Sequence, residues 1–83
     1  LAELGALNLG NNQLRILPAS IGQLANLESL DLINNRLTAL PKSLGQLKAL
    51  KLPDLRGNPL NPALQSAYNN GLHALRTYLS NLK

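Results

Sequence analysis

Few side chains of this chain are suited to acid–base or nucleophilic chemistry. The candidates are one histidine, His73, and two serines, Ser20 and Ser43, which lie 23 residues apart. A general base must reach an acid or a nucleophile by a hydrogen bond, and no carboxylate lies near His73 in the sequence. Cysteine, a glycine-rich phosphate loop and metal-ligand spacings are absent. We therefore expect no catalytic residue, cofactor or metal, a solvent-facing His73, and serines that cap turns.

Two carboxylates, Asp31 and Asp54, share the 23-residue interval of the serines, and the same interval runs through most of the chain. Residues 4–26 and 27–49 share 12 identities in 23 positions. A third, weaker copy keeps Leu50, Asp54, Leu55, Asn58 and Leu60 in register. Internal repetition at this length is typical of proteins built from stacked units.

The spacing within one repeat predicts a coil made of a strand, a turn and a returning segment. Leucines in the pattern LxxLxL alternate with exposed residues, as in a short strand. Asn12, Asn35 and Asn58 follow where the chain turns into the core, and buried peptide groups there need hydrogen-bond partners. We expect these asparagines to stack as a ladder. Pro18 and Pro41 then open short helical or 3₁₀ stretches. The residues expected to face inward from those stretches are Ile21, Leu24, Leu44 and Leu47.

Together these residues form the motif LxxLxLxxNxLxxLPxxIGxL. This motif resembles the leucine-rich repeat in the 23-residue form of intracellular Ras-group and bacterial proteins, a form that Roco proteins and scribble-like scaffolds share. The resemblance implies an α/β fold: a right-handed solenoid with a short parallel sheet on its concave face and helical or 3₁₀ segments on its convex face. It also implies a protein ligand, such as a small GTPase or another signalling protein, and a cytoplasmic location.

The pattern divides the chain into leucine-rich repeats, residues 1–60, and C-terminal capping helices, residues 61–83. The repeat part holds the tail of one repeat, two full repeats and a partial third. Asn61 can cap a helix that begins with Pro62, and Gly71 suits a helix C-terminus. The residues that then recur with a helical period are Leu72, Leu75, Leu79 and Leu82. The only aromatic residues, expected to close the core, are Tyr68 and Tyr78.

The first coil has no polar cap before it in this sequence, because residues 1–4 match residues 24–27 in the tail of a repeat. Its leucines are therefore expected to meet solvent and to drive self-association into a homo-oligomer.

Residues that alternate with the strand leucines should point outward and form the binding surface. Asp31 and Asp54 would lie side by side, one strand spacing of about 4.8 Å apart, where like charges oppose each other. Arg56, on the same face, can offset this repulsion. Either the row accepts a basic or donor-rich partner segment, or it is a pair of solvated carboxylates partly neutralised by Arg56. The candidate partner-binding residues are Asn8, Ser29, Asp31, Ile33, Asp54 and Arg56.

Pro53 stands where earlier repeats have a strand leucine. Proline is tolerated mainly on edge strands, so we expect its nitrogen to face the open edge of the last strand. The alternative is a register slip that turns Leu52 inward. Glu28 and Lys51 occupy equivalent positions on neighbouring coils and are expected to form an ion pair.

Charge and composition argue against a nucleic-acid-binding protein and a membrane-spanning protein. The net charge is +4, from 8 Lys and Arg against 4 Asp and Glu, and the basic residues are scattered without interleaved aromatics, so we expect no nucleic-acid partner. No apolar run reaches the roughly 18 residues of a membrane span.

Arg15, Arg36 and Lys42 lie on loops leaving the sheet, where a second binding edge can form. We expect a non-catalytic protein–protein interaction module. The alternatives are the targeting arm of a larger GTPase or bacterial effector, and a structural self-association module.

Overall fold

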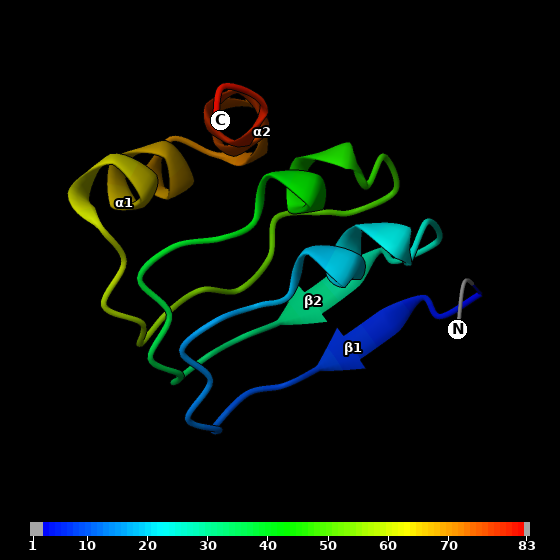
Figure 1. The fold of residues 1–83 in the computed structure, drawn as a ribbon, viewed down its shortest axis with the longest axis horizontal. Helices are drawn as coiled ribbons and strands as arrows, with labels where there is room; N and C mark the ends of the chain where they lie inside the picture. The colour runs from blue at the N-terminus through cyan, green and yellow to red at the C-terminus, as the bar shows by residue number, and fades with distance from the viewer. Residues whose placement is uncertain (1–2, 83) are drawn as a thin grey trace.

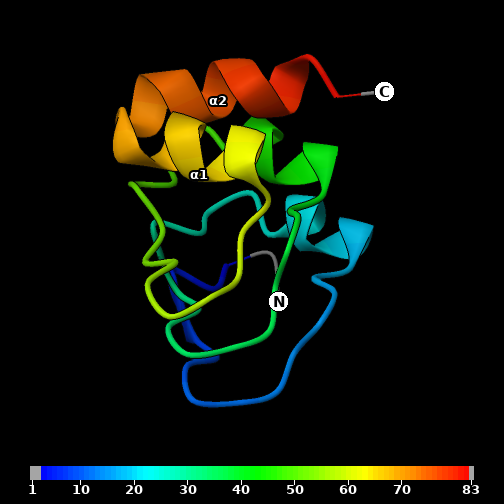
Figure 2. The same ribbon diagram turned by 90° about the vertical axis from the view of Figure 1, so that its left-hand side faces the viewer.

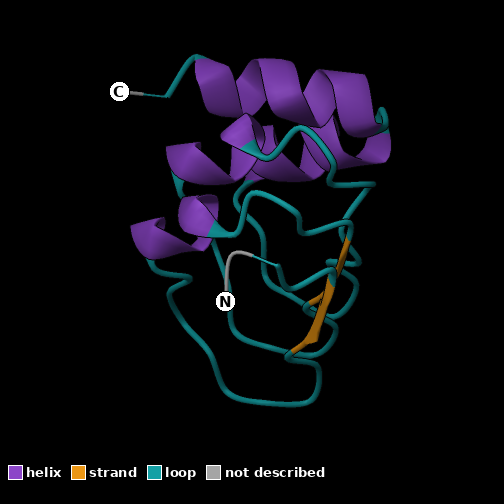
Figure 3. Cartoon of the chain, turned by 90° about the vertical axis from the view of Figure 1, so that its right-hand side faces the viewer, coloured by secondary structure: helices purple, strands orange, loops and turns teal. Residues whose placement is uncertain are grey.

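The structure, a computed structural model, describes residues 3–82. In chain order the elements are β1 (Ala6–Asn8), η1 (Ala19–Gln23), β2 (Ser29–Asp31), η2 (Lys42–Gln46), α1 (Pro62–Asn69) and α2 (Leu72–Ser80), with η denoting a 3₁₀ turn. The strands lie along one side, the 3₁₀ turns along the other, and the helices cover one end (Figure 1, Figure 3). This arrangement agrees with the expected α/β fold. Three residues included in the repeat and cap predictions, Leu1, Ala2 and Lys83, lie outside the described residues.

Strands β1 and β2 pair in parallel, and the 23-residue interval sets their register. Leu7 lies opposite Leu30, and Asn8 lies opposite Asp31. The expected third strand shortens to a single bridge between Asp31 and Asp54. On either side of that bridge, backbone hydrogen bonds still join the third coil to the second, from the Lys51 N–H to the Glu28 carbonyl and from the Asn34 N–H to the Arg56 carbonyl, each at 2.9 Å.

Leucines at equivalent positions of the coils pack into one core. Leu32 and Leu55 are 0% and 1% exposed, and Leu9 packs against the same cluster. Burying each such side chain contributes about 1.5–3 kcal/mol. Leu7 and Leu9 of the first coil are only partly buried, whereas their equivalents Leu30 and Leu32 are buried. The self-association expected of this first layer stays a prediction.

The expected asparagine ladder forms and joins each coil to the one before it. Asn35 is buried; its Oδ1 accepts from the Leu14 N–H at 3.1 Å, and its Nδ2 donates to the carbonyls of Leu9 and Leu32, both at 3.0 Å. Asn58 repeats the pattern one coil later, accepting at 3.1 Å and donating at 2.8 and 3.0 Å. The peptide groups of each inward turn are thereby paired, which removes the cost of burying them.

A second row of residues makes the turn possible by adopting left-handed backbone. Asn11, Asn34 and Gly57 are repeat equivalents with φ of 58°, 56° and 78°. Asn and Gly are the residues that tolerate this conformation. The Asn34 Nδ2 donates to the Asn11 Oδ1 at 2.9 Å, and a Cβ at Gly57 would collide with the Asn34 side chain. Both the positive φ and the steric contact with Asn34 therefore restrict which residues can occupy this row.

Glycines let the 3₁₀ side of the molecule pack closely. A Cβ added at Gly22 of η1 would lie 2.6 Å from the Ser43 Cβ of η2. One repeat later, a Cβ at Gly45 of η2 would lie 3.1 Å from the Leu79 Cβ of α2. Helix α2 thus takes the place that a further 3₁₀ turn would have. Of the residues expected to face inward here, Ile21, Leu44 and Leu47 are buried and Leu24 is partly buried against the core.

Pro53 lies with its nitrogen directed away from β2, as predicted. Asp54 next to it donates to the Leu30 carbonyl at 3.0 Å and accepts from the Leu32 N–H at 2.9 Å. Because successive residues of a strand direct their backbone groups to opposite sides, Pro53 faces the other way. The alternative register slip is wrong, since Leu52 is 45% exposed. The edge that Pro53 faces is covered, because Pro53 is buried and shares a small cavity lining with α2.

Helices α1 and α2 begin and end with recognisable caps. The Asn61 Oδ1 accepts from the Leu64 N–H at 2.9 Å and Pro62 is the first helical residue, both as expected. Gly71 was expected at a helix C-terminus, and it directly follows Asn70, the C-cap of α1; it is also the N-cap of α2. Its φ of 100° allows the chain to reverse, so that the two helices lie against each other (Figure 2), and α2 packs on η2.

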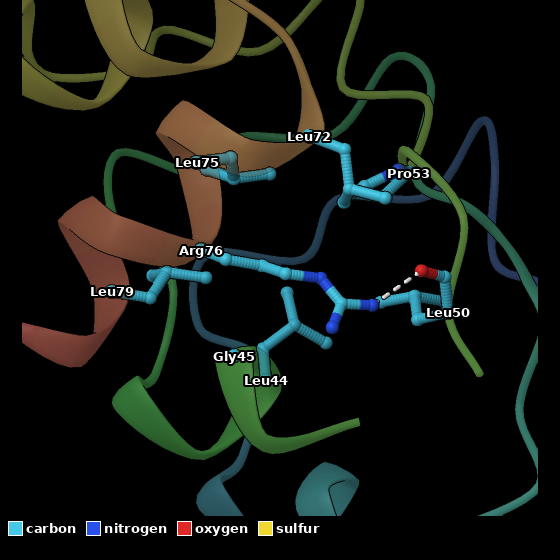
Figure 4. Close-up of a pocket in the computed structure, with 8 residues that line it drawn as sticks. All are labelled: Leu44, Gly45, Leu50, Pro53, Leu72, Leu75, Arg76 and Leu79. Carbon is cyan, nitrogen blue, oxygen red and sulfur yellow. Dashed lines mark hydrogen bonds between the residues drawn. The ribbon is translucent and has the colours of Figure 1, made fainter. Parts of the chain in front are cut away.

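Two side chains of these helices tie them to the last coil. The Leu55 N–H donates to the Tyr68 hydroxyl oxygen at 3.1 Å, which supplies the partner that the next strand would otherwise provide. The Arg76 guanidinium donates to the Leu47 carbonyl at 3.0 Å. It also donates to the Leu50 carbonyl at 2.8 Å (Figure 4). The stripe expected on α2 is confirmed, with Leu75 and Leu79 each 1% exposed.

The Gly22→Ala substitution should destabilise the fold by about 1–3 kcal/mol, because its Cβ must displace η2. Urea unfolding monitored by circular dichroism measures the change. Gly5→Ala is the matched control: nothing lies within 4 Å of a Cβ built there, so its stability should stay within about 1 kcal/mol of wild type. Equal losses for the two variants would contradict close packing at Gly22.

The Tyr68→Phe substitution should lower the free energy of unfolding by about 1–3 kcal/mol, because it leaves the buried Leu55 N–H without an acceptor. Tyr78→Phe provides the control, since among residues 3–82 the Tyr78 hydroxyl has no hydrogen-bond partner. Amide hydrogen exchange should quicken at Leu55 in the first variant only. Unchanged protection of that amide would argue against the cap contact.

Candidate functional site

The outward residues of the strands and of the segments after them form one surface, here called the sheet face. It consists of three rows of repeat equivalents, each running across the coils: Ala6, Ser29 and Leu52; Asn8, Asp31 and Asp54; Gly10, Ile33 and Arg56. These side chains are exposed or half-buried, while the alternating residues form the core. The paired register places Asn8 beside Asp31, and Asp31 beside Asp54. All six candidate residues from the sequence therefore lie on this surface.

The middle row also shapes the backbone, a role that the sequence-based interpretation missed. The Asn8 Oδ1 accepts from the Gly10 N–H at 2.9 Å, and the Asp31 Oδ1 accepts from the Ile33 N–H at 3.0 Å. The third coil makes the same contact from the Arg56 N–H at 3.3 Å. Asn and Asp favour this bond to the backbone two residues on. Their recurrence at one repeat position just before a turn is the signal that could have revealed it.

Arg56 pairs with the nearer carboxylate, Asp54. Its Nε donates to the Asp54 Oδ1 at 2.9 Å and its Nη2 to the Asp54 Oδ2 at 2.7 Å. This two-pronged contact, first of all the hydrogen bonds from the guanidinium, lowers the pKa of the Asp54 carboxyl below its ordinary value. Among the described residues it is the only ion pair. The middle row thus carries one paired carboxylate, Asp54, and one carboxylate without an ion pair, Asp31.

The apolar part of the sheet face is small. Ile33 is half-buried, and Leu52 is exposed. Leu52 was expected to point outward but was not counted among the binding residues. Leu52 belongs to the first row and Ile33 to the third, on adjacent coils. They therefore lie on opposite sides of the middle row, which holds Asp31 and Asp54.

The ion pair expected between Glu28 and Lys51 does not form. The two residues are joined only by their backbones, with the Lys51 N–H donating to the Glu28 carbonyl at 2.9 Å. Both side chains are exposed. Long exposed side chains lose conformational entropy when they pair, which offsets the gain from a surface contact.

The residues considered for catalysis lie apart from the sheet face. His73 is exposed on α2, as expected. Neither serine caps its own turn: the Ser43 Oγ donates instead to the Ala19 carbonyl of the preceding coil at 2.6 Å, and η1, which holds Ser20, has no side-chain cap. Within residues 3–82 no group of three or more His, Cys, Asp or Glu side chains is placed to hold a metal ion. No helix in that range is long and apolar enough to cross a membrane.

Comparison with known protein families identifies a relationship. A family model described as leucine rich repeat matches residues 2–60. The matched range contains both strands, both 3₁₀ turns and the three inward turns, and it ends just before α1. A search of curated proteins returns no match to the chain.

Replacing Arg56 by Gln should raise the pKa of the Asp54 carboxyl toward its ordinary value of about 3.9, because the hydrogen bonds from the guanidinium are lost. In wild type, where the folded pKa is the lower one, the stability from this group is fully present above the ordinary pKa and is lost as pH falls through the folded pKa. Carboxyl NMR titration of both proteins measures the shift.

Arg36→Gln is the control for this titration, because Arg36 is exposed and makes no ion pair within the described residues. It should leave the Asp54 titration unchanged. An Asp54 pKa that is the same in wild type and Arg56→Gln would show that the guanidinium does not hold the carboxylate in solution.

Proposed function

Because the chain belongs to the leucine-rich repeat family, whose model matches residues 2–60, we propose that it is a non-catalytic module that binds another protein through the sheet face. Leucine-rich repeat domains generally mediate protein–protein interactions. The observation that carries the proposal for this particular surface is the middle row, Asn8, Asp31 and Asp54, whose side chains are held in register by strand pairing and by bonds to their own turns.

Fixed side chains favour binding because little conformational freedom remains to be lost. The Oδ1 of Asn8 and of Asp31 is already engaged with a backbone N–H, which restricts the side-chain torsions. The Asp31 Oδ2 accepts no bond in the described residues and can accept one from a partner. The surface therefore offers a positioned acceptor rather than a mobile charged chain.

The chemistry of the rows suggests the partner's complementary groups. The three charged side chains of the face, Asp31, Asp54 and Arg56, sum to a charge of −1, and the negative charge without an ion pair sits on Asp31. A lysine or arginine of the partner would face Asp31, with donors opposite Ser29 and Asn8. An aliphatic side chain of the partner would pack against Ile33. We propose these residues, with Asp54 and Arg56, as the partner-binding set.

Several finer features belong to the same proposal. The coils would form part of a solenoid with the sheet face on its concave side, of the intracellular 23-residue type. Residues 1–60 would act as the repeat array and residues 61–83 as its cap. The partner would be a signalling protein such as a small GTPase, met in the cytoplasm. The motif and the family match support the repeat array, and the contacts of Tyr68 and Arg76 support the cap. The intracellular type, the partner class and the cytoplasmic location follow from the resemblance of the motif alone.

The test is capture of proteins from a lysate of the source organism by wild type and by a double variant, Asp31→Asn with Ile33→Ser. Asn in place of Asp31 keeps the bond to the backbone, as Asn8 does, so the fold should persist while the charge is lost. Affinity for a captured partner should fall about tenfold or more, the loss expected of one charged contact and one apolar contact.

Glu28→Gln is the matched control for capture, since it removes one exposed carboxylate that lies outside the three rows. It should retain the wild-type partners with unchanged affinity. Identical sets of proteins on wild type and on the double variant, with equal dissociation constants, would contradict binding through the sheet face.

A further inference from the structure

A second surface lies away from the sheet face, where the chain returns from the turn toward the 3₁₀ side. The returning segments of the first two coils border a groove with a volume of about 300 Å³, lined by residues 15–17 and 38–41. The side chains of Leu17 and Leu40 are 4% and 5% exposed, so they form its floor. The groove is open at the surface and belongs to residues that the proposed function does not use.

The groove exists because the two returning segments part from each other after one backbone contact. The Arg36 N–H donates to the Leu14 carbonyl at 2.8 Å. Between the second and third coils, Thr38 accepts at its carbonyl from the Asn61 backbone N–H and Nδ2, both at 2.9 Å. The equivalent contact one coil earlier, from the Thr38 N–H to the Arg15 carbonyl, does not form, and within residues 3–82 neither group has another hydrogen-bond partner.

An exposed aliphatic side chain stands at the groove. Ile16 is 77% exposed, the most exposed of the large apolar residues in the described range. Its equivalent in the next repeat is the much smaller Ala39, which also lines the groove. A single exposed aliphatic residue is common on protein surfaces. Here it borders a hollow with apolar walls and exposed backbone groups, an arrangement that suits an extended chain with one apolar side chain.

The charged residues in the groove lining and next to it in the sequence are all basic. Arg15 lines it, Lys42 follows the lining directly, and Arg36 lies two residues before it. No Asp or Glu occurs in residues 9–27 or 32–53. The three cations are exposed and make no ion pair within the described residues. Charge complementarity therefore favours an acidic occupant.

We propose that this groove docks an extended acidic peptide segment of a partner protein, with one aliphatic side chain against Ile16 and flanking carboxylates facing Arg15 and Lys42. The peptide backbone would bond to the Thr38 N–H and the Arg15 carbonyl. A peptide fits better than single-stranded nucleic acid, because nucleic-acid grooves offer aromatic rings for stacking and the only aromatic residues, Tyr68 and Tyr78, lie in α1 and α2.

The test uses the 83-residue chain and a fluorescein-labelled peptide with a central leucine between two glutamates on each side. Fluorescence anisotropy should give a dissociation constant of about 100 μM at low salt, weakening as salt is raised. Ile16→Ser should reduce the affinity about tenfold, and Arg15→Gln or Lys42→Gln about threefold each. Amide NMR shifts should concentrate on residues 15–17 and 38–41.

Matched controls lie on other surfaces. Lys51→Gln removes an exposed cation and Leu52→Ser an exposed aliphatic side chain away from the groove; both should bind the peptide as wild type does. The Asp31→Asn/Ile33→Ser variant should also bind it normally, so this inference and the sheet-face proposal fail independently. A peptide with Gln in place of Glu, or Ala in place of the leucine, should bind about tenfold more weakly.

Four results would overturn the proposal. These are no binding at about 1 mM peptide, affinity insensitive to Ile16→Ser, an equal affinity for an oligothymidine of similar charge, or shifts that map to the sheet face. Sedimentation equilibrium without peptide gives a further outcome: self-association abolished by Ile16→Ser would make the groove a contact between copies of this chain instead.

Discussion

The buried asparagine carboxamide is the group on which the stack of coils depends. A chain that turns inward at every repeat buries peptide groups, and Asn35 and Asn58 pair them on both sides of each turn. Each side chain bonds to its own coil and to the one before it, so it fixes the vertical alignment of the coils as well as the turn. An apolar residue of similar size would fill the space but would leave donors and acceptors without partners, at a cost of about 1–3 kcal/mol for each group.

Because the coils are aligned, residues 23 apart in the sequence lie next to each other on the surface. A residue type that recurs at that interval therefore forms a row, and recurring charged residues of one sign repel each other. Asp31 and Asp54 are adjacent for this reason. Their repulsion is tolerable because the Arg56 guanidinium neutralises Asp54 and each carboxylate is also engaged by a turn amide. The same rule makes Ile16 and Ala39 repeat equivalents at the groove between the first two coils, where the returning segments part after the contact between Arg36 and Leu14.

The sequence predicted the parts of the structure that depend on periodicity. The register of the strands, the asparagine ladder, the direction of Pro53 and the Asn61 cap all follow from positions in the repeat. It did not predict features that depend on where one side chain turns: the bonds of Asp31 and Asp54 to their own turns, the Tyr68 hydroxyl as an acceptor, or the absence of a Glu28–Lys51 pair. The left-handed backbone at Asn11, Asn34 and Gly57 could have been predicted from the sequence, because Asn and Gly are the residues that most readily adopt a positive φ.

The last coil shows how the end of the stack bears on the sheet face. Strand pairing holds Asp31 from both sides, but Asp54 has a strand neighbour on one side only. On its other side the Leu55 N–H bonds to Tyr68, the Leu47 and Leu50 carbonyls bond to Arg76, and Gly45 packs against Leu79. The first and the last of these contacts replace the strand and the 3₁₀ packing of a further coil, and the Arg76 contacts hold the segment between η2 and the third strand. The positions of Asp54 and Arg56 are therefore supported from the far side of the core, by helices that contribute no residue to the three rows.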